Sequence, residues 1–272
     1  MVRPDLHLPQ AFVAWMAPFL TAFCQRSRDT AAALAVGALT AIGPRTVTNC
    51  LRALGLAEHP SFTAFHRVLN RNVWSGLALA RTLLRLLVPV FEPGRPFVII
   101  GVDHTLERRR GRRIEAASHF HDAVRSTAKQ KVTSRGLRWV SAMLLVNVPF
   151  AARIWGLPVL TALTPSKAWC ESHKRRYRPV TEWAEMAKVP MAQAIGMPSE
   201  GERLLLTLHR WLPERVIVAV MDGEFAAIAL LHRLRRSMVV ITRLRLDACL
   251  FDPPPPYTTG VAHLRNEVPS PR

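Results

Sequence analysis

Two aspartates follow apolar runs and could bind metal ions together. Asp103 comes directly after Phe97–Val102, and Asp222 comes directly after Arg215–Met221. Both runs have the composition of strands buried on both faces, so each aspartate is expected at the carboxyl edge of a sheet, where open α/β sheets bind ligands. Mg²⁺ prefers such oxygen ligands, and a pair of Mg²⁺ ions can clamp the attacking and leaving oxygens of a phosphodiester. The pattern predicts metal-dependent phosphodiester chemistry.

Each aspartate also has a purely local interpretation. An aspartate at a strand end commonly forms a turn or caps a helix, and Asp222 before Gly223 fits that alternative. Asp103 precedes His104 and Thr105 rather than a turn residue, which favours a binding site there. The alternative stays open for Asp222.

Other acidic and histidine side chains lie near these positions in the sequence. Glu107 and Glu224 are interpreted either as outer partners of the site or as solvated groups that pair with arginines. His119, His121 and Asp122 are of residue types that bind metals, but the sequence has no second pair of ligands that would complete a site with them. We therefore predict that the two histidines are strand or loop residues.

The balance of charges favours a polyanionic partner. Lysine and arginine number 37 against 19 aspartates and glutamates, a net charge of +18. Binding of nucleic acid would neutralise such an excess with release of counterions. An arginine-rich composition inherited from a GC-rich genome is the alternative.

Two basic clusters follow the first acidic position. The first cluster spans residues 108–113, and its positive charges repel one another, so we expect it on the surface. The second cluster spans residues 173–178 and contains one tyrosine. Such charges bind phosphates in a salt-dependent way without reading sequence, whereas solvated loops are the alternative. The residues predicted to contact phosphates are Arg108, Arg109, Arg110, Arg112, Arg113, Lys129, Lys131, Lys174, Arg175 and Arg176.

Cysteine usage and hydropathy predict a cytoplasmic protein without a membrane span. Asp5 and two prolines interrupt the N-terminus before an apolar segment develops, and Arg81 and Arg85 interrupt the longest apolar stretch. The scattered cysteines form no CxxC pair, which indicates thiols in a reducing compartment rather than zinc ligands or disulfides. They are Cys24, Cys50, Cys170 and Cys249.

The first 92 residues have helical periodicity. Helices are expected over 12–23, 31–39 (capped by Asp29 or Thr30), 47–54, 61–69 and 73–88. The helices within 45–54 and 61–71 resemble a helix-turn-helix with a long turn, which would place His66, Arg67, Asn70 and Arg71 near DNA. A helical hairpin formed for packing is the alternative.

The pattern changes to strands after the proline- and glycine-containing linker at 92–96. Strands are expected over 97–102, 215–221 and 238–242, with a hairpin of 139–146 and 152–159. Helices are expected over 179–212, interrupted at Pro190 and by a turn at 196–199, and over 225–235. This order predicts an α/β fold with a mixed sheet. We predict a helical N-terminal domain over 1–92 that could bind DNA, a core over 97–252 and an irregular tail over 253–272.

The two acidic segments resemble motifs of one enzyme family. Phe97–Thr105 is similar to the first catalytic strand of DDE-type insertion-sequence transposases, which have an RNase H-like core, and Val216–Ala226 is similar to their second acidic motif. The resemblance extends from about residue 10 to about residue 255. It implies that Asp103 and Asp222 are catalytic metal ligands for Mg²⁺, with Mn²⁺ as the alternative. It also implies double-stranded DNA partners, both element ends and target, and a homo-oligomer on DNA.

The sequence departs from that family near its C-terminus, where the third acid of the family is expected on a later helix. Only Glu267 follows the four prolines at 253–256, in a stretch without helical periodicity, and Asp247 and Asp252 are the candidate substitutes. The simplest hypothesis is truncation or a frameshift near Pro256.

Three functions fit these observations. The first is a DNA transposase that cleaves DNA and transfers strands, in a truncated copy. The second is a catalytically inactive DNA-binding transposon remnant, and the third is a general RNase H-like nuclease without preference for terminal repeats.

Overall fold

The computed structural model describes residues 10–127, 129–174, 176–177, 194–195 and 197–244. The chain divides into two compact units, one of residues 1–98 with 143–160 and the other of residues 99–142 with 161–272. The predicted boundaries of the helical domain, the core and the tail stay predictions, and the tail lies outside the described residues.

The N-terminal part of the first unit consists of helices around a small apolar core. The helices α2, α3 and α4 pack on one another, and their core includes Leu34, Leu51 and Phe65. Thr46 and Ser75 cap α3 and α5 through side-chain oxygens that accept backbone N–H groups. The helices are α1 (Gln10–Leu20), α2 (Gln25–Thr40), α3 (Val47–Ala53), α4 (Phe62–Asn70) and α5 (Gly76–Phe91).

The structure corrects one detail of the helix predictions. Asp29 and Thr30 do not cap the second helix, because α2 already begins at Gln25 with Cys24 as its N-cap residue. The apolar periodicity starts only at Ala31, whereas the backbone hydrogen bonds of the helix begin a turn and a half earlier. The predicted helical character of the region is confirmed.

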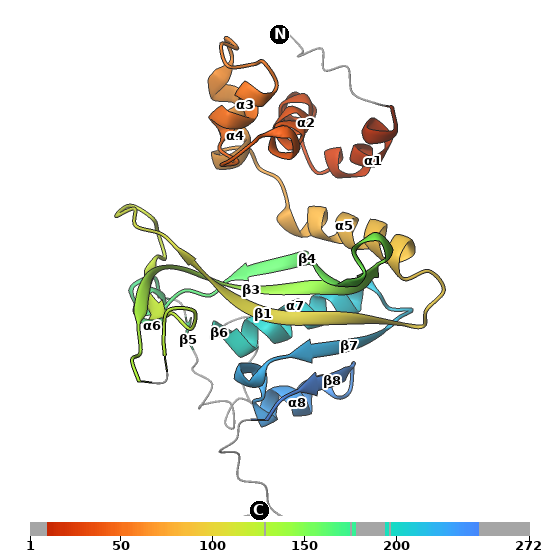
Figure 1. The fold of residues 1–272 in the computed structure, drawn as a ribbon, viewed down its shortest axis with the longest axis vertical. Helices are drawn as coiled ribbons and strands as arrows, with labels where there is room; N and C mark the ends of the chain where they lie inside the picture. Colours follow the sequence, from red (N-terminus) through yellow and green to blue (C-terminus); the bar gives the residue numbers. More distant parts are fainter. Residues whose placement is uncertain (1–9, 128, 175, 178–193, 196, 245–272) are drawn as a thin grey trace, which may run out of the picture. The chain divides into compact units, whose positions relative to one another are not determined.

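A mixed six-stranded sheet follows, in the order β2-β3-β1-β7-β8, with β4 paired to β3 (Figure 1). β2 and β3 are antiparallel, and β7 and β8 are parallel. This arrangement confirms the predicted mixed α/β class and is consistent with an RNase H-like core. The strands are β1 (Phe97–Arg108), β2 (Ser118–His121), β3 (Thr133–Val148), β4 (Arg153–Leu163), β7 (Val216–Met221) and β8 (Val239–Thr242).

Shorter elements complete the described fold. They are η1 (Pro149–Ala151), α6 (Lys167–Ser172), β5 (Arg176–Tyr177), β6 (Ala194–Ile195), α7 (Met197–Trp211), η4 (Gly223–Phe225) and α8 (Ile228–Leu234). The predicted hairpin is confirmed, because η1 and the left-handed Ala152 join β3 to β4. The predicted turn at 196–199 is wrong, since α7 already begins at Met197. The expected interruption at Pro190 lies outside the described residues.

The first strand is longer than predicted. The sequence predicts a strand that ends at Val102, but β1 continues to Arg108. Gly136 in β3 permits the extension, because a Cβ atom there would overlap the backbone of Glu107. Asp103 therefore lies within β1 rather than at its end.

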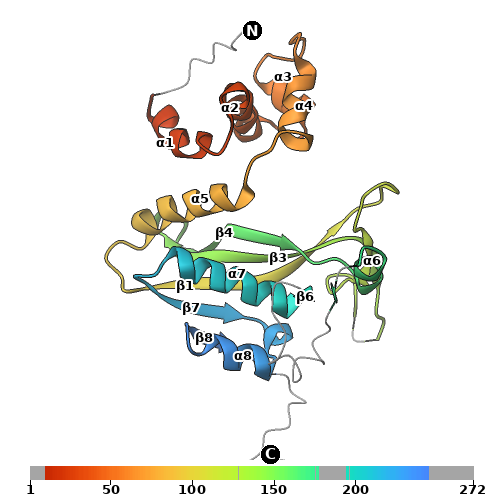
Figure 2. The same ribbon diagram turned by 180° about the vertical axis from the view of Figure 1, so that it is seen from behind.

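Two helices of the second unit pack on the sheet beside the last strands. α7 contacts β7 and η4, and α8 contacts β8; Figure 2 shows α7 in front of the sheet. Leu205, Leu208, Phe225 and Leu230 are completely buried between these elements. No helix among the described residues is long and apolar enough to cross a membrane.

Candidate metal centre and its basic surroundings

Asp103 and Asp222 come together in the second unit. With His104 they form a group in which one potential ligand atom from each residue lies within 4.8 Å of the others. The two aspartates are 119 positions apart in the sequence. Carboxylate oxygens and an imidazole nitrogen at this spacing can bind a divalent cation.

Neighbouring strands position the two carboxylates. β1 and β7 are adjacent in the sheet and run toward the same end of it in Figure 1. β7 ends at Met221, so Asp222 emerges beside the middle of the longer β1. The hydroxyl of Thr242 donates to the carbonyl oxygen of Asp222 (2.9 Å), which ties the end of β7 to the end of β8.

Backbone N–H groups orient both carboxylates. Oδ1 of Asp103 accepts from the N–H of His104 (2.7 Å), and Oδ1 of Asp222 accepts from the N–H of Glu224 (3.0 Å). The local interpretation of Asp222 is thereby confirmed, because it caps η4. Capping occupies one oxygen and leaves the other oxygen of the carboxylate for a ligand.

His104 lies between acidic side chains at the same place. Its Nδ1 atom is 3.9 Å from Oδ1 of Asp103 and 3.5 Å from Oε2 of Glu224. This nitrogen is buried and has no hydrogen-bond partner among the described residues. The side chain of Asp103 is 59% exposed, so the group is open to a large substrate on that side.

A packed layer beneath the cluster supports Asp222. Phe225 is completely buried, and a Cβ atom at Gly201 of α7 would lie 2.9 Å from its ring. Only glycine allows α7 to approach η4 this closely. The close packing restricts the segment that carries Asp222 and Glu224.

A buried carboxylate joins the two helices of this layer. Glu202 of α7 pairs with Arg233 of α8 (Oε1–Nε 2.9 Å), and only 2% of the Glu202 side chain is exposed. Burial raises the pKa of Glu202 to about 7, although the attraction of Arg233 opposes the shift.

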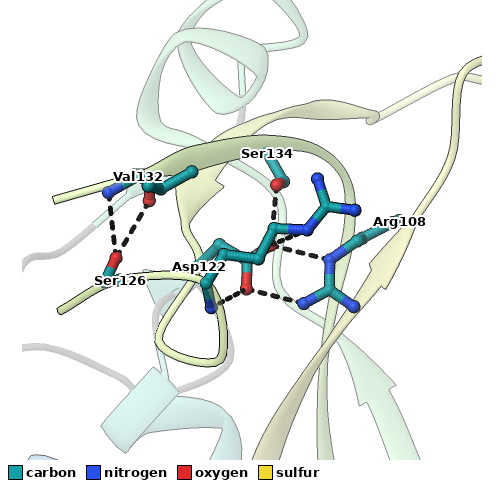
Figure 3. Close-up of polar contacts among 6 residues, drawn as sticks. Arg108, Asp122, Ser126, Val132 and Ser134 are labelled. Atoms are coloured by element: carbon teal, nitrogen blue, oxygen red, sulfur yellow. Dashed lines mark hydrogen bonds and ion pairs between the residues drawn. The ribbon is translucent and has the colours of Figure 1, made fainter. Parts of the chain in front are cut away.

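Arg108 is held by a buried aspartate (Figure 3). Its Nε and Nη2 atoms each donate to one oxygen of Asp122 at 2.7 Å, and the hydroxyl of Ser134 donates to the same carboxylate at 2.6 Å. These hydrogen bonds hold the pKa of Asp122 far below its ordinary value, and the bonds from Arg108 have the largest effect. Asp122 is thus the partner of an arginine rather than a metal ligand. Two nitrogens of the Arg108 guanidinium are held by this ion pair, so Arg108 stabilises the fold.

The other predicted basic contacts lie mostly on loops. Arg110, Arg112 and Arg113 are exposed between β1 and β2, while Arg109 pairs with Glu107. Figures 1 and 2 show that the loops joining β1, β2 and β3, together with α6, lie at the end of the sheet toward which β1 and β7 run. The remaining predicted residues are exposed Lys129, Lys131 and Lys174, Arg176 in β5, and Arg175, which lies outside the described residues.

Sequence reasoning singled out two other histidines and missed His104. His119 and His121 are exposed on β2, as predicted for strand residues. The sequence feature that could have indicated His104 as part of the site is its position directly after Asp103. Glu224 lies by the cluster through His104, whereas Glu107 bonds Arg109 and the indole N–H of Trp139 (3.0 Å).

Comparison with known proteins identifies the family. A family model described as DDE superfamily endonuclease matches residues 18–271, a span that includes both aspartates. Comparisons with curated proteins and with solved structures returned no match. The match covers nearly the whole chain and agrees with the mixed sheet and the paired acids. The chain belongs to the DDE superfamily of endonucleases.

Proposed function

We propose that this chain is the transposase of an insertion sequence, which cleaves DNA in a metal-dependent reaction and transfers the new 3′ end to target DNA. Membership of the DDE superfamily implies a DNA substrate and a divalent metal. The observation that carries the proposal is the meeting of Asp103 and Asp222 beside His104.

The donor atoms suit a divalent cation. Each aspartate is oriented by a backbone N–H at one oxygen, which leaves a hard oxygen donor of the kind that Mg²⁺ and Mn²⁺ prefer. The side chain of Asp103 is 59% exposed, which leaves its carboxylate accessible from solvent. We propose that Asp103 and Asp222 hold Mg²⁺, with Mn²⁺ as the alternative.

The chain's own residues would bind and orient the DNA around this position. A bound cation supplies charge neutralisation at the scissile phosphate and activates the attacking oxygen. The exposed loop arginines Arg110, Arg112 and Arg113 would contact phosphates of the strand beside the site. Arg108 would hold the base of their loop through Asp122 rather than contact DNA with its full guanidinium.

The helices of the first unit offer a further DNA-binding surface. α4 packs on α2 through Phe65 and Val68, which leaves His66, Arg67 and Asn70 exposed on its other face. A short helix with such a face, carried by two supporting helices, can enter a major groove. We propose that α4 contacts the ends of the element.

The third acidic ligand of the family has three candidates in this sequence. Asp247, Asp252 and Glu267 all lie outside the described residues, and the truncation near Pro256 stays a prediction. The proposal rests on the two aspartates that the structure describes.

A cleavage assay tests the proposal. The 272-residue chain is incubated with DNA that flanks its own gene and with Mg²⁺ or Mn²⁺, and nicked and joined products are measured. We expect metal-dependent cleavage that Asp103→Asn or Asp222→Asn lowers by about 1,000-fold, because the metal supplies several kcal/mol of transition-state stabilisation. Glu58→Gln, an exposed acid between α3 and α4, is the matched control.

The outcomes separate the candidate functions. Binding of DNA without any metal-dependent product would overturn the proposal in favour of the inactive DNA-binding remnant. Cleavage that shows no preference for flanking repeats would instead identify a general nuclease. Cleavage that survives both aspartate substitutions would place the reaction elsewhere in the chain.

A further inference from the structure

We propose that His104 is a third ligand at the Asp103–Asp222 site and that its nitrogen makes the site bind Mn²⁺ more tightly than Mg²⁺. This inference rests on the proposed function, since it assumes that the two aspartates hold a divalent cation. It adds a ligand and a metal preference that the pair of acids alone does not provide.

The donor atoms of His104 and Asp103 lie close together. Nδ1 of His104 lies 3.9 Å from Oδ1 of Asp103, and the three residues offer atoms within 4.8 Å of one another. Two donors on one cation with bonds of about 2.1 Å are separated by at most about 4.2 Å. Oδ1 also accepts the N–H of His104, but it has a second lone pair, so this oxygen and the histidine nitrogen are close enough to share an ion.

The Nδ1 atom of His104 has no hydrogen-bond partner among the described residues, although it is buried. Its distances of 3.9 Å and 3.5 Å to the oxygens of Asp103 and Glu224 exceed the 2.7–3.2 Å usual for N–H···O bonds. Buried polar atoms normally have a partner. A cation between the nitrogen and the carboxylates would satisfy all of these groups at once.

A further carboxylate lies beside the imidazole of His104. Glu224 lies near the same ring and follows Asp222 by two residues, so a short segment positions both acids. Oε2 of Glu224 lies 3.5 Å from Nδ1 itself, and a nitrogen that binds a metal has no proton to donate, so Glu224 would offset the charge of the cation rather than accept a hydrogen bond from the ring. Glu224 is thus a further carboxylate beside the proposed metal position at Nδ1.

The metal preference follows from the chemistry of the donors. Mg²⁺ binds oxygen ligands and gives up its water reluctantly, whereas an imidazole nitrogen is a softer donor that transition metals accept. A site of two carboxylates and one imidazole should therefore favour Mn²⁺. Replacement of the imidazole by a carboxylate should reduce that preference.

Pulsed electron paramagnetic resonance of the Mn²⁺-loaded chain tests the ligand directly. A coordinated imidazole produces ¹⁴N modulation of the Mn²⁺ signal, and we expect it in the unmodified chain and in His121→Ala, which changes an exposed histidine of β2. We expect no modulation in His104→Ala, with Mn²⁺ affinity lower by at least about 10-fold, because loss of a ligand costs at least as much as loss of a group that supports one. Glu224→Gln should keep the modulation and lower the affinity.

A second variant distinguishes the loss of the nitrogen ligand from a folding defect. His104→Asp should bind Mn²⁺ without ¹⁴N modulation and should shift the ratio of Mn²⁺ to Mg²⁺ affinity toward Mg²⁺, as titration calorimetry would measure. Modulation that persists in both His104 variants, or that is absent from the unmodified chain while Mn²⁺ binding still needs Asp103 and Asp222, overturns the inference alone. Mn²⁺ binding that is indifferent to Asp103→Asn and Asp222→Asn overturns the proposed function as well.

Discussion

Single carboxylates in this chain serve different purposes that depend on their immediate neighbours. Asp222 caps η4 through one oxygen and faces Asp103 in the candidate site. Asp122, from a similarly polar stretch, is buried and bound on both oxygens by Arg108. The first carboxylate keeps an oxygen for a ligand, whereas the second is saturated and stabilises the fold.

Glu202 makes the stability of the second unit depend on pH. Its pKa is about 7 in the folded chain and near its ordinary value of 4.5 in the unfolded chain. Between these values the folded state keeps a proton that the unfolded state has released, so stability falls as pH rises from about 4.5 to about 7.

Glu202→Gln should reduce that loss. The amide stays neutral at every pH, so the urea midpoint of the variant should fall less between about pH 5 and about pH 8 than that of the unmodified chain. Glu214→Gln, at an exposed position, should leave the pH dependence as it is. An equal fall in all three proteins would show that Glu202 is not the responsible group.

At the scale of elements, the length of β1 decides where the site forms. β7 ends after six residues, while β1 runs for twelve and carries Asp103 past its midpoint toward Arg108. The far half of β1 pairs with β3, where Gly136 allows close backbone contact with Glu107. The site therefore depends on a glycine that takes no part in its chemistry.

Gly136→Ala should destabilise the fold by about 1–3 kcal/mol, because the added methyl group overlaps backbone that cannot move freely. Chemical denaturation measures the change. Gly76→Ala is the matched control, since the nearest atom to its added Cβ is 4.0 Å away at Trp74. Equal stability of the two variants would contradict the tight approach of β1 and β3.

At the scale of the whole molecule, positive charge is the dominant property. The net charge of +18 favours binding to any polyanion, so the loops near the site must be distinguished from charge elsewhere. Arg109, Arg110, Arg112 and Arg113 lie together between β1 and β2. If they contact phosphates, their removal will change the salt dependence of DNA binding more than the loss of four arginines on helices.

Replacement of these four arginines by glutamine should flatten the plot of log DNA affinity against log salt by about 0.9 for each lost phosphate contact. Fluorescence anisotropy at several salt concentrations measures the slope. The control replaces the same number of exposed arginines on α2, α5 and α7: Arg26, Arg81, Arg85 and Arg210. Equal slopes for the two variants would mean that only total charge matters.

Elements whose patterns are local could be predicted from the order of the residues alone. The apolar runs before Asp103 and Asp222 predicted buried strands, and the periodicity of the first 92 residues predicted helices. These features follow from side chains a few positions apart, which periodicity can read. The charge excess, and with it a polyanionic partner, is likewise a property of composition.

Which distant residues come into contact could be learned only from the folded chain. The extension of β1 beyond Val102, the ion pair of Arg108 with Asp122, and the place of His104 between acids all depend on segments distant in the chain. Local pattern holds no information on which strands become neighbours or which side chain reaches a given partner. Strand neighbours and side-chain partners are set by the packing of the whole sheet and its helices, where side chains far apart in the sequence must fill the same space.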